Sequence, residues 1–486
     1  MGEARTTARG AAINIVATLF KLGLNIFVVV PILARVLGPD IFGLAAMAMT
    51  IFLFLSVFGD AGLPPALIRD RSSTSETWTS AFWMTVFIGV GFAAVSHITA
   101  PFLADFYNQP EITPLARVLG YAILFQTICS IPIAWLQREQ KLGHVALAET
   151  LSVVLSGIIA IWMGLTGYGV WALVIQQLVL GASRFALSYG LARFDRHVTW
   201  HFAWHEVRPL LGFSLSLTGA SFVAFLNRRS DSILIGRYLG AEMMGMYSRA
   251  FQLMQLPNQV IAKGLGFASY PAMARVAHDR NWLSMLYLKQ LGAMSFLAFP
   301  LMIGLSVLAE PLILTLLGEK WVTIAPTFAF LAVAGLAQAF VAGGGDVFKV
   351  LGHADRLLIW AILRFCVFLP SFVLGVWMES TLWLAIFYSI ANVILLVPYQ
   401  VEIARLLKQT VRQQAEHMIP PLVASLVMAG ALAVCQPLIE PMISFAPLRL
   451  AALILLGIAL YFAMLRLAFA EFMFFNLAHA KHLLRK

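Results

Sequence analysis

The chain alternates between long apolar runs and short polar connections over its whole length. A helix rises 1.5 Å per residue, so roughly 20 apolar residues cross the hydrocarbon core of a bilayer. That measure predicts fourteen membrane-spanning helices, at about 11–34, 39–60, 79–101, 115–136, 145–165, 169–190, 209–236, 241–263, 286–309, 324–342, 357–378, 381–401, 419–436 and 447–468. The connections are too short for a separate water-soluble domain. The pattern therefore predicts an all-α integral membrane protein.

Composition excludes the main alternatives to a membrane protein. Of the 486 residues, 60% are hydrophobic and only 12% are charged. A water-facing surface needs roughly a quarter or more of charged residues, so soluble enzymes, nucleic-acid-binding proteins and secreted disulfide scaffolds are excluded. The three cysteines lie inside apolar runs without metal-ligand spacing, which favours a packing role. We expect no cofactor and no metal.

The distribution of Lys and Arg predicts the orientation in the membrane. One set of connections carries twenty of these cations and the opposite set carries five. Because cytoplasmic connections are enriched in Lys and Arg, we expect both termini in the cytoplasm. Two basic amphipathic stretches, 193–208 and 402–418, predict interfacial helices. In the first of these, three histidines four residues apart could hold a metal, although an interfacial helix is the favoured interpretation: His197, His201 and His205.

An internal repeat predicts the architecture. At an offset of 202, residues 10–50 align with 212–252, and the shared motif is R-x-L-G-x-[DE]-x-x-G. The motif begins at Arg35 in one copy and at Arg237 in the other. It predicts a tight turn between two spans, with glycine at positions where a side chain would obstruct the turn. A weaker match pairs Leu142-Gly143-His144 with Leu351-Gly352-His353. The repeat predicts two pseudo-symmetric six-helix lobes plus two extra C-terminal helices, an arrangement that suits a transporter with its site between the lobes.

The corresponding division of the chain has five parts. We expect a first lobe at 1–190 and a second at 209–401, joined by a cytoplasmic amphipathic connection at 191–208. A second amphipathic linker at 402–418 leads to the two extra helices and a cytoplasmic tail at 419–486.

Several motifs carry a family resemblance. The stretch 227–247, the triplet Gln255-Leu256-Pro257, the triplet Tyr270-Pro271-Ala272 and the first-lobe turn 35–44 resemble the polysaccharide transporter branch of the MOP flippase superfamily, and most of all the Wzx-type flippases. The resemblance runs across the chain. It implies a flippase that moves polyprenyl-pyrophosphate-linked oligosaccharide from the inner to the outer leaflet of the bacterial plasma (inner) membrane. It also implies membrane lipids and polysaccharide polymerase or export machinery as partners, and no nucleic acid.

Charged residues inside the spans are the candidate site. Lys289 and Arg466 can extend to the headgroups, and Arg184 is marginal by the same criterion. Five cations lie deeper, where a charge costs about 2.5–3.5 kcal/mol and needs a cavity or a partner: Lys21, Arg228, Arg229, Arg249 and Arg364. One acid, Asp231, lies comparably deep. This cationic excess suits a pyrophosphate group, since arginine matches phosphate oxygens. Alternatively, Arg228 and Asp231 neutralise each other at i, i+3, and Lys21 and Arg364 bond backbone carbonyls or helix ends.

A polar stripe marks the eighth predicted span. Arg249, Gln252, Gln255 and Gln259 recur at steps of three, three and four residues, so they share one helical face. Glutamine amides can donate to and accept from sugar hydroxyls. The other interpretation is hydrogen bonding between helices.

Three other functions fit parts of the pattern. A multidrug exporter of the same superfamily would want buried carboxylates, but the deep charges here are mostly positive. A membrane enzyme would need an external catalytic platform, and the longest external connection, about 102–114, is too short. A non-transporting scaffold leaves the deep cations unexplained. We expect no enzymatic activity, with Asp231, and Glu149 at a span edge, as the candidates for ion coupling.

Overall fold

The computed structural model of the chain describes residues 14, 16–59, 62–69, 73–194, 199–470 and 472, with the backbone alone for 209–224, 226–228, 262–268 and 354. The described residues form helices and turns without strands. The helical elements are η1 (Asn25–Val29), α2 (Val30–Leu37), α3 (Pro39–Ser56), α4 (Leu63–Arg69), α5 (Ser75–Tyr107), α6 (Ile112–Arg138), α7 (Leu142–Leu165), α8 (Trp171–Ala192), α9 (Trp204–Arg275), α10 (Arg280–Val307), α11 (Ala309–Leu316), η3 (Glu319–Ile324), α12 (Ala325–Val350), α13 (Ala354–Trp377), α14 (Thr381–Leu407), α15 (Val411–Ile439) and α16 (Ala446–Ala468).

Twelve helices in the described part are long and apolar enough to cross a membrane. They coincide with twelve of the fourteen predicted spans. The first runs over Val16–Leu37 and contains the π-helical turn η1 just before Pro31, which has no N–H for a regular helical bond. The remaining two predicted spans fall in α9, whose helical geometry is interrupted at Gly240. The all-α membrane fold is confirmed, and the count of fourteen stays a prediction.

Contacts divide the chain into two compact units, Met1–Met246 and Tyr247–Lys486. The division falls inside α9, so the first half of α9 packs with the N-terminal unit. By the repeat, that half is the first helix of the second lobe. The predicted lobe boundaries therefore stay predictions.

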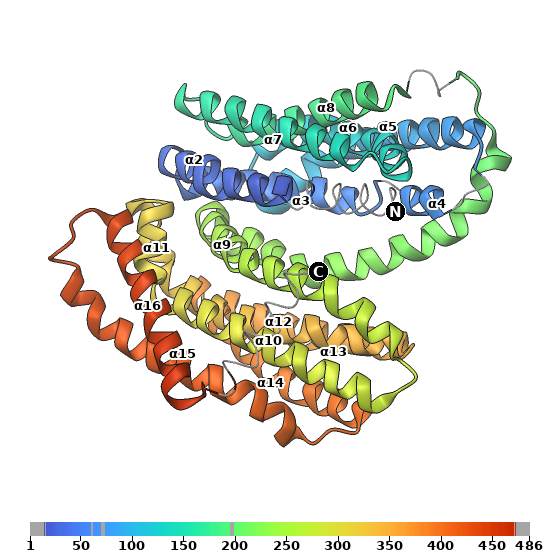
Figure 1. Cartoon of the computed structure of the whole chain (residues 1–486). Helices are drawn as coiled ribbons and strands as arrows, with labels where there is room; N and C mark the ends of the chain where they lie inside the picture. The colour runs from blue at the N-terminus through green and yellow to red at the C-terminus, as the bar shows by residue number, and fades with distance from the viewer. Residues whose placement is uncertain are drawn as a thin grey trace. The chain divides into compact units, whose positions relative to one another are not determined.

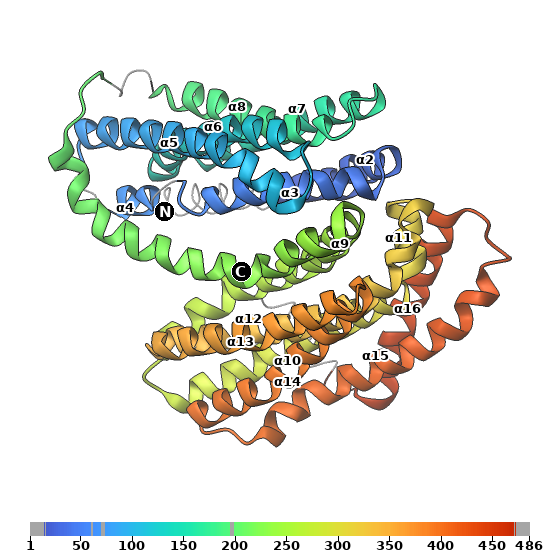
Figure 2. The same ribbon diagram turned by 180° about the vertical axis from the view of Figure 1, so that it is seen from behind.

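Helices α5 to α8 form the body of the N-terminal unit, with α6 between α5 and α8 (Figures 1 and 2). Small residues let their backbones approach. A Cβ on Gly181 of α8 would lie 3.1 Å from the carbonyl oxygen of Ala122, and one on Gly120 of α6 would lie 3.1 Å from Cβ of Ser96. Small residues at helix contacts are the usual means of packing in lipid, where apolar side chains gain little by leaving the solvent.

Helices α10, α12, α13 and α14 form the body of the C-terminal unit, and α15 packs on α10. Glycines again allow close contact: a Cβ on Gly344 of α12 would lie 2.4 Å from Cδ1 of Ile403 on α14. The last two helices, α15 and α16, pack on each other through a small apolar core that includes Met428, Leu432 and Leu453. They are the two helices predicted to lie outside the repeat.

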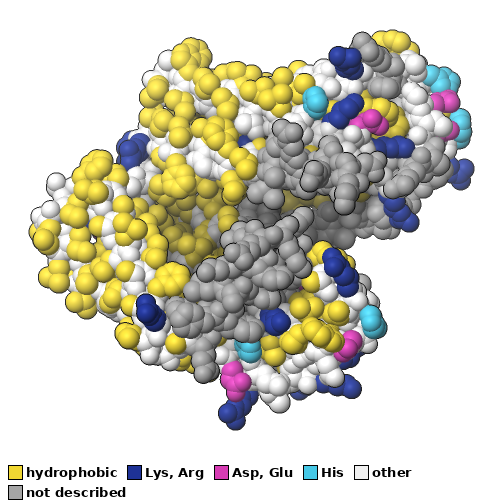
Figure 3. Space-filling view, in the orientation of Figure 1, with side chains coloured by type: hydrophobic (Ala, Val, Ile, Leu, Met, Phe, Trp, Pro, Cys, Tyr) yellow, Lys and Arg dark blue, Asp and Glu magenta, His cyan; other side chains and the backbone are white. Residues whose placement is uncertain are grey.

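Hydrophobic side chains are spread widely over the face of the molecule that Figure 3 shows, far more than charged ones. Exposed large side chains such as Phe102, Ile158 and Ile394, each more than half exposed, belong to spanning helices and suit contact with lipid. Charged and histidine side chains gather toward the ends of the units. This distribution is that of a multi-pass membrane protein.

Neither predicted interfacial helix is one continuous helix in the described residues, and their place at the membrane surface stays a prediction. Residues 199–203 are not helical, and Trp204 then begins α9. The stretch 402–418 consists of the end of α14 and the start of α15, separated at Lys408, which has a left-handed backbone (φ 54°). Hydrogen bonds to α5 hold the non-helical residues 199–203: Trp83 Nε1 donates to the Thr199 carbonyl (2.9 Å), and the Ala203 N–H donates to Ser80 Oγ (3.0 Å).

The repeated turn is confirmed in detail. Gly38 has φ 82° and ψ 171°, and Gly240 has φ 84° and ψ −178°. This conformation suits only glycine, which explains the glycine in both copies of the motif. Pro39 and Ala241 then begin the next helical segments.

The last glycines of the two motifs pack against each other inside the N-terminal unit. A Cβ on Gly43 would lie 1.6 Å from the carbonyl oxygen of Ala241, and one on Gly245 would lie 1.8 Å from that of Pro39. The two copies of the turn therefore meet backbone to backbone, in a reciprocal contact that no side chain could occupy.

The second sequence match is wrong as a structural equivalence. Leu142 begins α7, whereas Gly352 lies before α13 with φ 75°. The matching conformations are instead Lys141 (φ −82°, ψ 50°) and His353 (φ −86°, ψ 58°), each preceding its helix. The offset between the copies thus grows from 202 to 212 because later connections differ in length.

Candidate functional site

A charged cluster lies inside the N-terminal unit. The carboxylate of Glu149 on α7 pairs with Lys21 of the first span through one oxygen (2.5 Å from Nζ) and with Arg184 on α8 through the other (2.5 Å from Nη2). Their side chains are 23%, 16% and 36% exposed, respectively. Three separate helices thus bring two cations to one carboxylate.

This cluster corrects the sequence analysis in two respects. Lys21 was expected to lack a carboxylate at its depth, but Glu149 is its partner. Arg184 was set aside as marginal, yet it shares that carboxylate. Sequence position could not pair them, since 128 residues separate Lys21 from Glu149. The cluster still carries one positive charge in excess.

The first half of α9 carries three more of the predicted site residues. Asp231 is buried, and one of its carboxylate oxygens accepts a hydrogen bond from the Ser232 N–H (2.6 Å). Arg229 is half-buried. The side chain of Arg228 lies outside the described residues, so its predicted pairing with Asp231 stays a prediction.

The polar stripe of α9 divides into two kinds of residue. Gln252 and Gln259 are exposed, while Arg249 is half-buried. The Gln255 amide donates to Gln338 Oε1 on α12 (3.4 Å), and Gln338 donates to the Tyr388 hydroxyl on α14 (2.8 Å). Gln255 therefore bonds to a neighbouring helix, which is the alternative that the sequence left open.

Arg364, the remaining predicted residue, lies on α13 and faces α14. Its guanidinium carbon is 5.4 Å from the centre of the Tyr399 ring, an arrangement in which the cation is attracted to the aromatic face. The Tyr399 hydroxyl donates to the Val341 carbonyl (3.0 Å). Arg364, Arg249 and the glutamines all belong to the C-terminal unit, whereas Lys21, Arg229 and Asp231 belong to the N-terminal unit.

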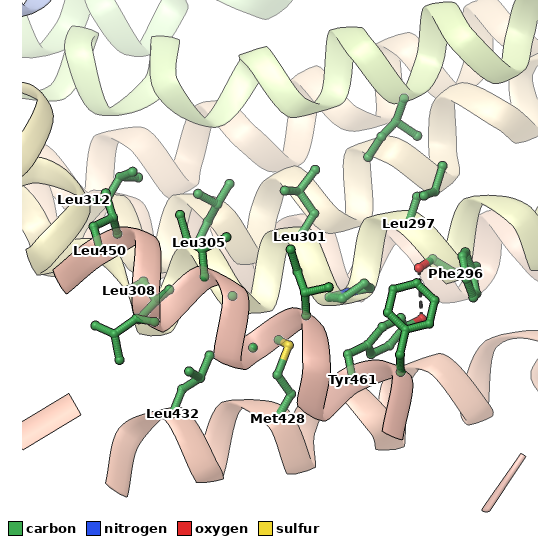
Figure 4. Close-up of a pocket in the computed structure, with 18 of the residues that line it drawn as sticks. Phe296, Leu297, Leu301, Leu305, Leu308, Leu312, Met428, Leu432, Leu450 and Tyr461 are labelled. Atoms are coloured by element: carbon green, nitrogen blue, oxygen red, sulfur yellow. Dashed lines mark hydrogen bonds between the residues drawn. The ribbon is translucent and has the colours of Figure 1, made fainter. Parts of the chain in front are cut away.

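An apolar groove of about 580 Å³ lies within the C-terminal unit. It is lined from α9, α10, α11, α15 and α16, and Figure 4 shows the leucines of α10 on one side and side chains of α15 and α16 on the other. The lining is Val260, Ile261, Phe296, Leu297, Pro300, Leu301, Gly304, Leu305, Leu308, Leu312, Met428, Leu432, Leu450, Leu453, Ile454, Gly457, Ile458, Tyr461 and Phe462.

The groove offers almost no polar contact. Tyr461 has the one side-chain hydroxyl of the lining, and it donates to the Phe296 carbonyl (2.9 Å; dashed in Figure 4). Two glycines, Gly304 on α10 and Gly457 on α16, keep the groove open. Such a surface suits a long hydrocarbon chain and gives nothing to a charged or sugar group.

Comparison with known proteins decides the family. A profile described as polysaccharide biosynthesis protein matches residues 32–326. The chain belongs to this family. The succinoglycan biosynthesis transport protein ExoT of Rhizobium meliloti is 30% identical over 82% of this chain and 80% of its own length. The lipopolysaccharide biosynthesis protein WzxC of Escherichia coli is 24% identical over 84% of this chain and 83% of its own length.

Solved structures confirm the fold of this polysaccharide biosynthesis family member. The lipid II flippase MurJ in its inward closed conformation aligns with a TM-score of 0.78, 15% identity, and coverage of 95% of this chain and all of that one. An inward-facing multidrug resistance MATE transporter of the MOP superfamily aligns with a TM-score of 0.59, 15% identity, and coverage of 82% and 99%. These likenesses show a shared fold and confirm the all-α membrane fold that the sequence predicts.

The sequence analysis missed the groove and the partners of its site residues. The groove's signal was available as the absence of charge along 450–465 combined with glycine at position 457. Its shape depends on how α10, α15 and α16 diverge, which no periodicity reveals. Gln338 and Tyr388 carried no signal, because a polar residue in an apolar run does not specify the helix that it contacts.

Proposed function

We propose that this polysaccharide family member is a flippase that translocates polyprenyl-pyrophosphate-linked oligosaccharides from the inner to the outer leaflet of the plasma membrane. The observation that carries the proposal is the apolar groove of the C-terminal unit. The chain also belongs to the polysaccharide biosynthesis family, and its spans contain more deep cations than deep carboxylates. A lipid-linked oligosaccharide has a long hydrocarbon tail, an anionic pyrophosphate and a polar sugar, so it needs both kinds of surface.

The proposed pyrophosphate ligands are the deep cations. Lys21 and Arg229 in one unit and Arg249 and Arg364 in the other supply positive charge in apolar spans. Arg228 joins them on sequence alone. A fixed cation stabilises a phosphate strongly at low dielectric, and arginine can bind two oxygens at once. Gln252 and Gln259, which are exposed, and Gln255 are the proposed sugar contacts.

The groove is the proposed site for the polyprenyl tail. Each buried CH₂ gains about 0.8 kcal/mol on leaving water, although a tail that comes from lipid gains far less. The groove therefore selects by shape rather than by hydrophobicity alone. It would let the tail stay in contact with the protein while the head group passes through a polar path.

The proposal includes a transport mechanism and an orientation of the chain in the membrane. We propose that two lobes alternate access to a cationic cavity, with both termini in the cytoplasm and with polymerase and export machinery receiving the product. Asp231 is the proposed ion-coupling carboxylate. The second candidate, a multidrug exporter, is favoured by the MATE-like fold alone.

Leaflet assignment of polyprenyl-linked oligosaccharide tests the proposal in cells that lack the protein, with and without complementation. We expect accumulation in the cytoplasmic leaflet and rescue by the intact chain. An unchanged leaflet distribution would discard the flippase.

The cationic site has its own test. Arg229→Ala and Arg249→Ala, at normal protein levels, are expected to reduce rescue at least tenfold, since each loses a charge-assisted contact of about 1.5–3 kcal/mol. Arg466→Ala, in the exposed last turn of α16, is the matched control and should rescue fully. Full rescue by the first two variants would remove the cavity assignment.

A further inference from the structure

We propose that Glu149 is the internal counter-ion of an anion site formed by Lys21 and Arg184, and that a phosphate group of the substrate competes with it for these cations. This inference rests on the proposed function, because the phosphate-bearing lipid is the ligand. It adds two residues to the site and gives the carboxylate a regulatory role.

The geometry makes Glu149 a bridge. Its two oxygens pair with two different cations, each at 2.5 Å, and the three side chains come from the first span, α7 and α8. None of the three is near its partners in sequence. A carboxylate held in this way occupies the same donor groups that a phosphate would use.

The cluster has more donors than acceptors. A lysine and an arginine together offer eight N–H donors, while one carboxylate offers two oxygens. Nε of Arg184 is buried and has no hydrogen-bond partner among the described residues. A phosphate or pyrophosphate carries more oxygens and more negative charge than a carboxylate, so it satisfies this donor set better.

The cluster is only partly enclosed by other side chains. Arg184 is 36% exposed and Glu149 is 23% exposed, and in the proposed site an anion approaches the guanidinium from this exposed side. While Glu149 stays in place, its negative charge repels the incoming anion. Glu149 thus lowers the affinity for phosphate, which favours release of the substrate after translocation.

Pyrophosphate binding to the purified full chain tests the competition. Titration calorimetry with inorganic pyrophosphate is expected to show at least tenfold tighter binding to Glu149→Gln than to the unmodified protein, because like-charge repulsion of several kcal/mol is removed. Adding Lys21→Met to Glu149→Gln should abolish the gain. Glu440→Gln is the matched control, since Glu440 also pairs with an arginine (Arg449, 2.6 Å) in the other unit, and it should leave the affinity unchanged.

The outcomes separate this inference from simpler explanations. A merely structural role for Glu149 would lower affinity on substitution, so unchanged or weaker binding overturns the inference. If Glu149→Gln fails to fold, Glu149→Asp keeps the charge but is one methylene too short to reach both cations, and it should show a smaller gain; no gain overturns the inference. If the leaflet assay shows no translocation while Glu149→Gln still binds pyrophosphate more tightly, the flippase fails and the anion site stands.

Discussion

The contact between the two repeated turns makes Gly43→Ala the most informative single substitution. The added methyl would lie 1.6 Å from the Ala241 carbonyl oxygen, 2.5 Å from its carbon and 2.9 Å from the Gly245 nitrogen. An ordinary carbon–oxygen contact is about 3.3–3.6 Å, so the two backbones would have to separate by about 1.5–2 Å. All three atoms belong to the main chain, and no side-chain rotation can relieve the overlap.

The expected cost follows from that geometry. Overpacking a well-packed contact costs typically about 1–3 kcal/mol, and a clash with backbone belongs at the upper end. For a unit of this size, about 3 kcal/mol corresponds to a melting temperature lower by roughly 6–12 °C. Intrinsic tryptophan fluorescence of the purified protein during heating measures it. Gly245→Ala should behave in the same way, since its methyl would lie 1.8 Å from the Pro39 carbonyl oxygen.

A double substitution and a control make the test sharp. Once Gly43→Ala has separated the turns, Gly245→Ala has less contact to disrupt, so the double variant should cost clearly less than the sum of the two. Gly91→Ala on α5 is the control, because a Cβ there meets nothing within 4 Å and alanine is the better helix former. If Gly43→Ala and Gly91→Ala melt at the same temperature, the backbone contact does not exist as described.

Two further predictions concern the groove and a helix junction. Gly304→Leu should fill the groove and reduce complementation in the leaflet assay at least tenfold at normal protein level. Gly304→Ala is the control and should complement fully, because its methyl would meet Met428 Cε at an ordinary 3.6 Å. Full complementation by both variants would remove the groove from the substrate path. Lys408→Gly should raise the free energy of unfolding, measured by thermal melts, by about 0.5–1 kcal/mol. The reason is that glycine adopts the left-handed backbone conformation of Lys408 (φ 54°) without strain. A loss of stability would show that contacts of the lysine side chain matter more than its backbone conformation.

The apolar pattern predicted the helices well because the length and polarity of each spanning helix do not depend on the other helices. A spanning helix satisfies its own backbone hydrogen bonds, so its length and polarity are set locally. That is why the ranges 145–165 and 381–401 correspond closely to α7 and α14. The repeated turn was equally local, since the positive φ of Gly38 and Gly240 is specified by the glycine itself.

The predictions that failed depended on contacts between distant segments. The amphipathic pattern of 193–208 suggested a helix, but residues 199–203 are not helical, and Thr199 and Ala203 bond to α5 there. The charge of Lys21 was judged without its partner, because Glu149 lies 128 residues away. Hydropathy gives the depth of a residue, and only tertiary packing determines what it faces.

The Glu149 cluster also bears on the choice between the two transport functions. A cationic drug needs a carboxylate, and Glu149 already pairs with two resident cations, so such a drug would have to replace both Lys21 and Arg184 at its oxygens. A phosphate needs cations, and it has to displace a single carboxylate from a cluster that keeps a net positive charge. Displacing one anion from an electropositive site costs less than displacing two cations from a shared anion, because the remaining charge attracts the phosphate and repels the drug. The same three residues therefore favour an anionic substrate over a cationic one.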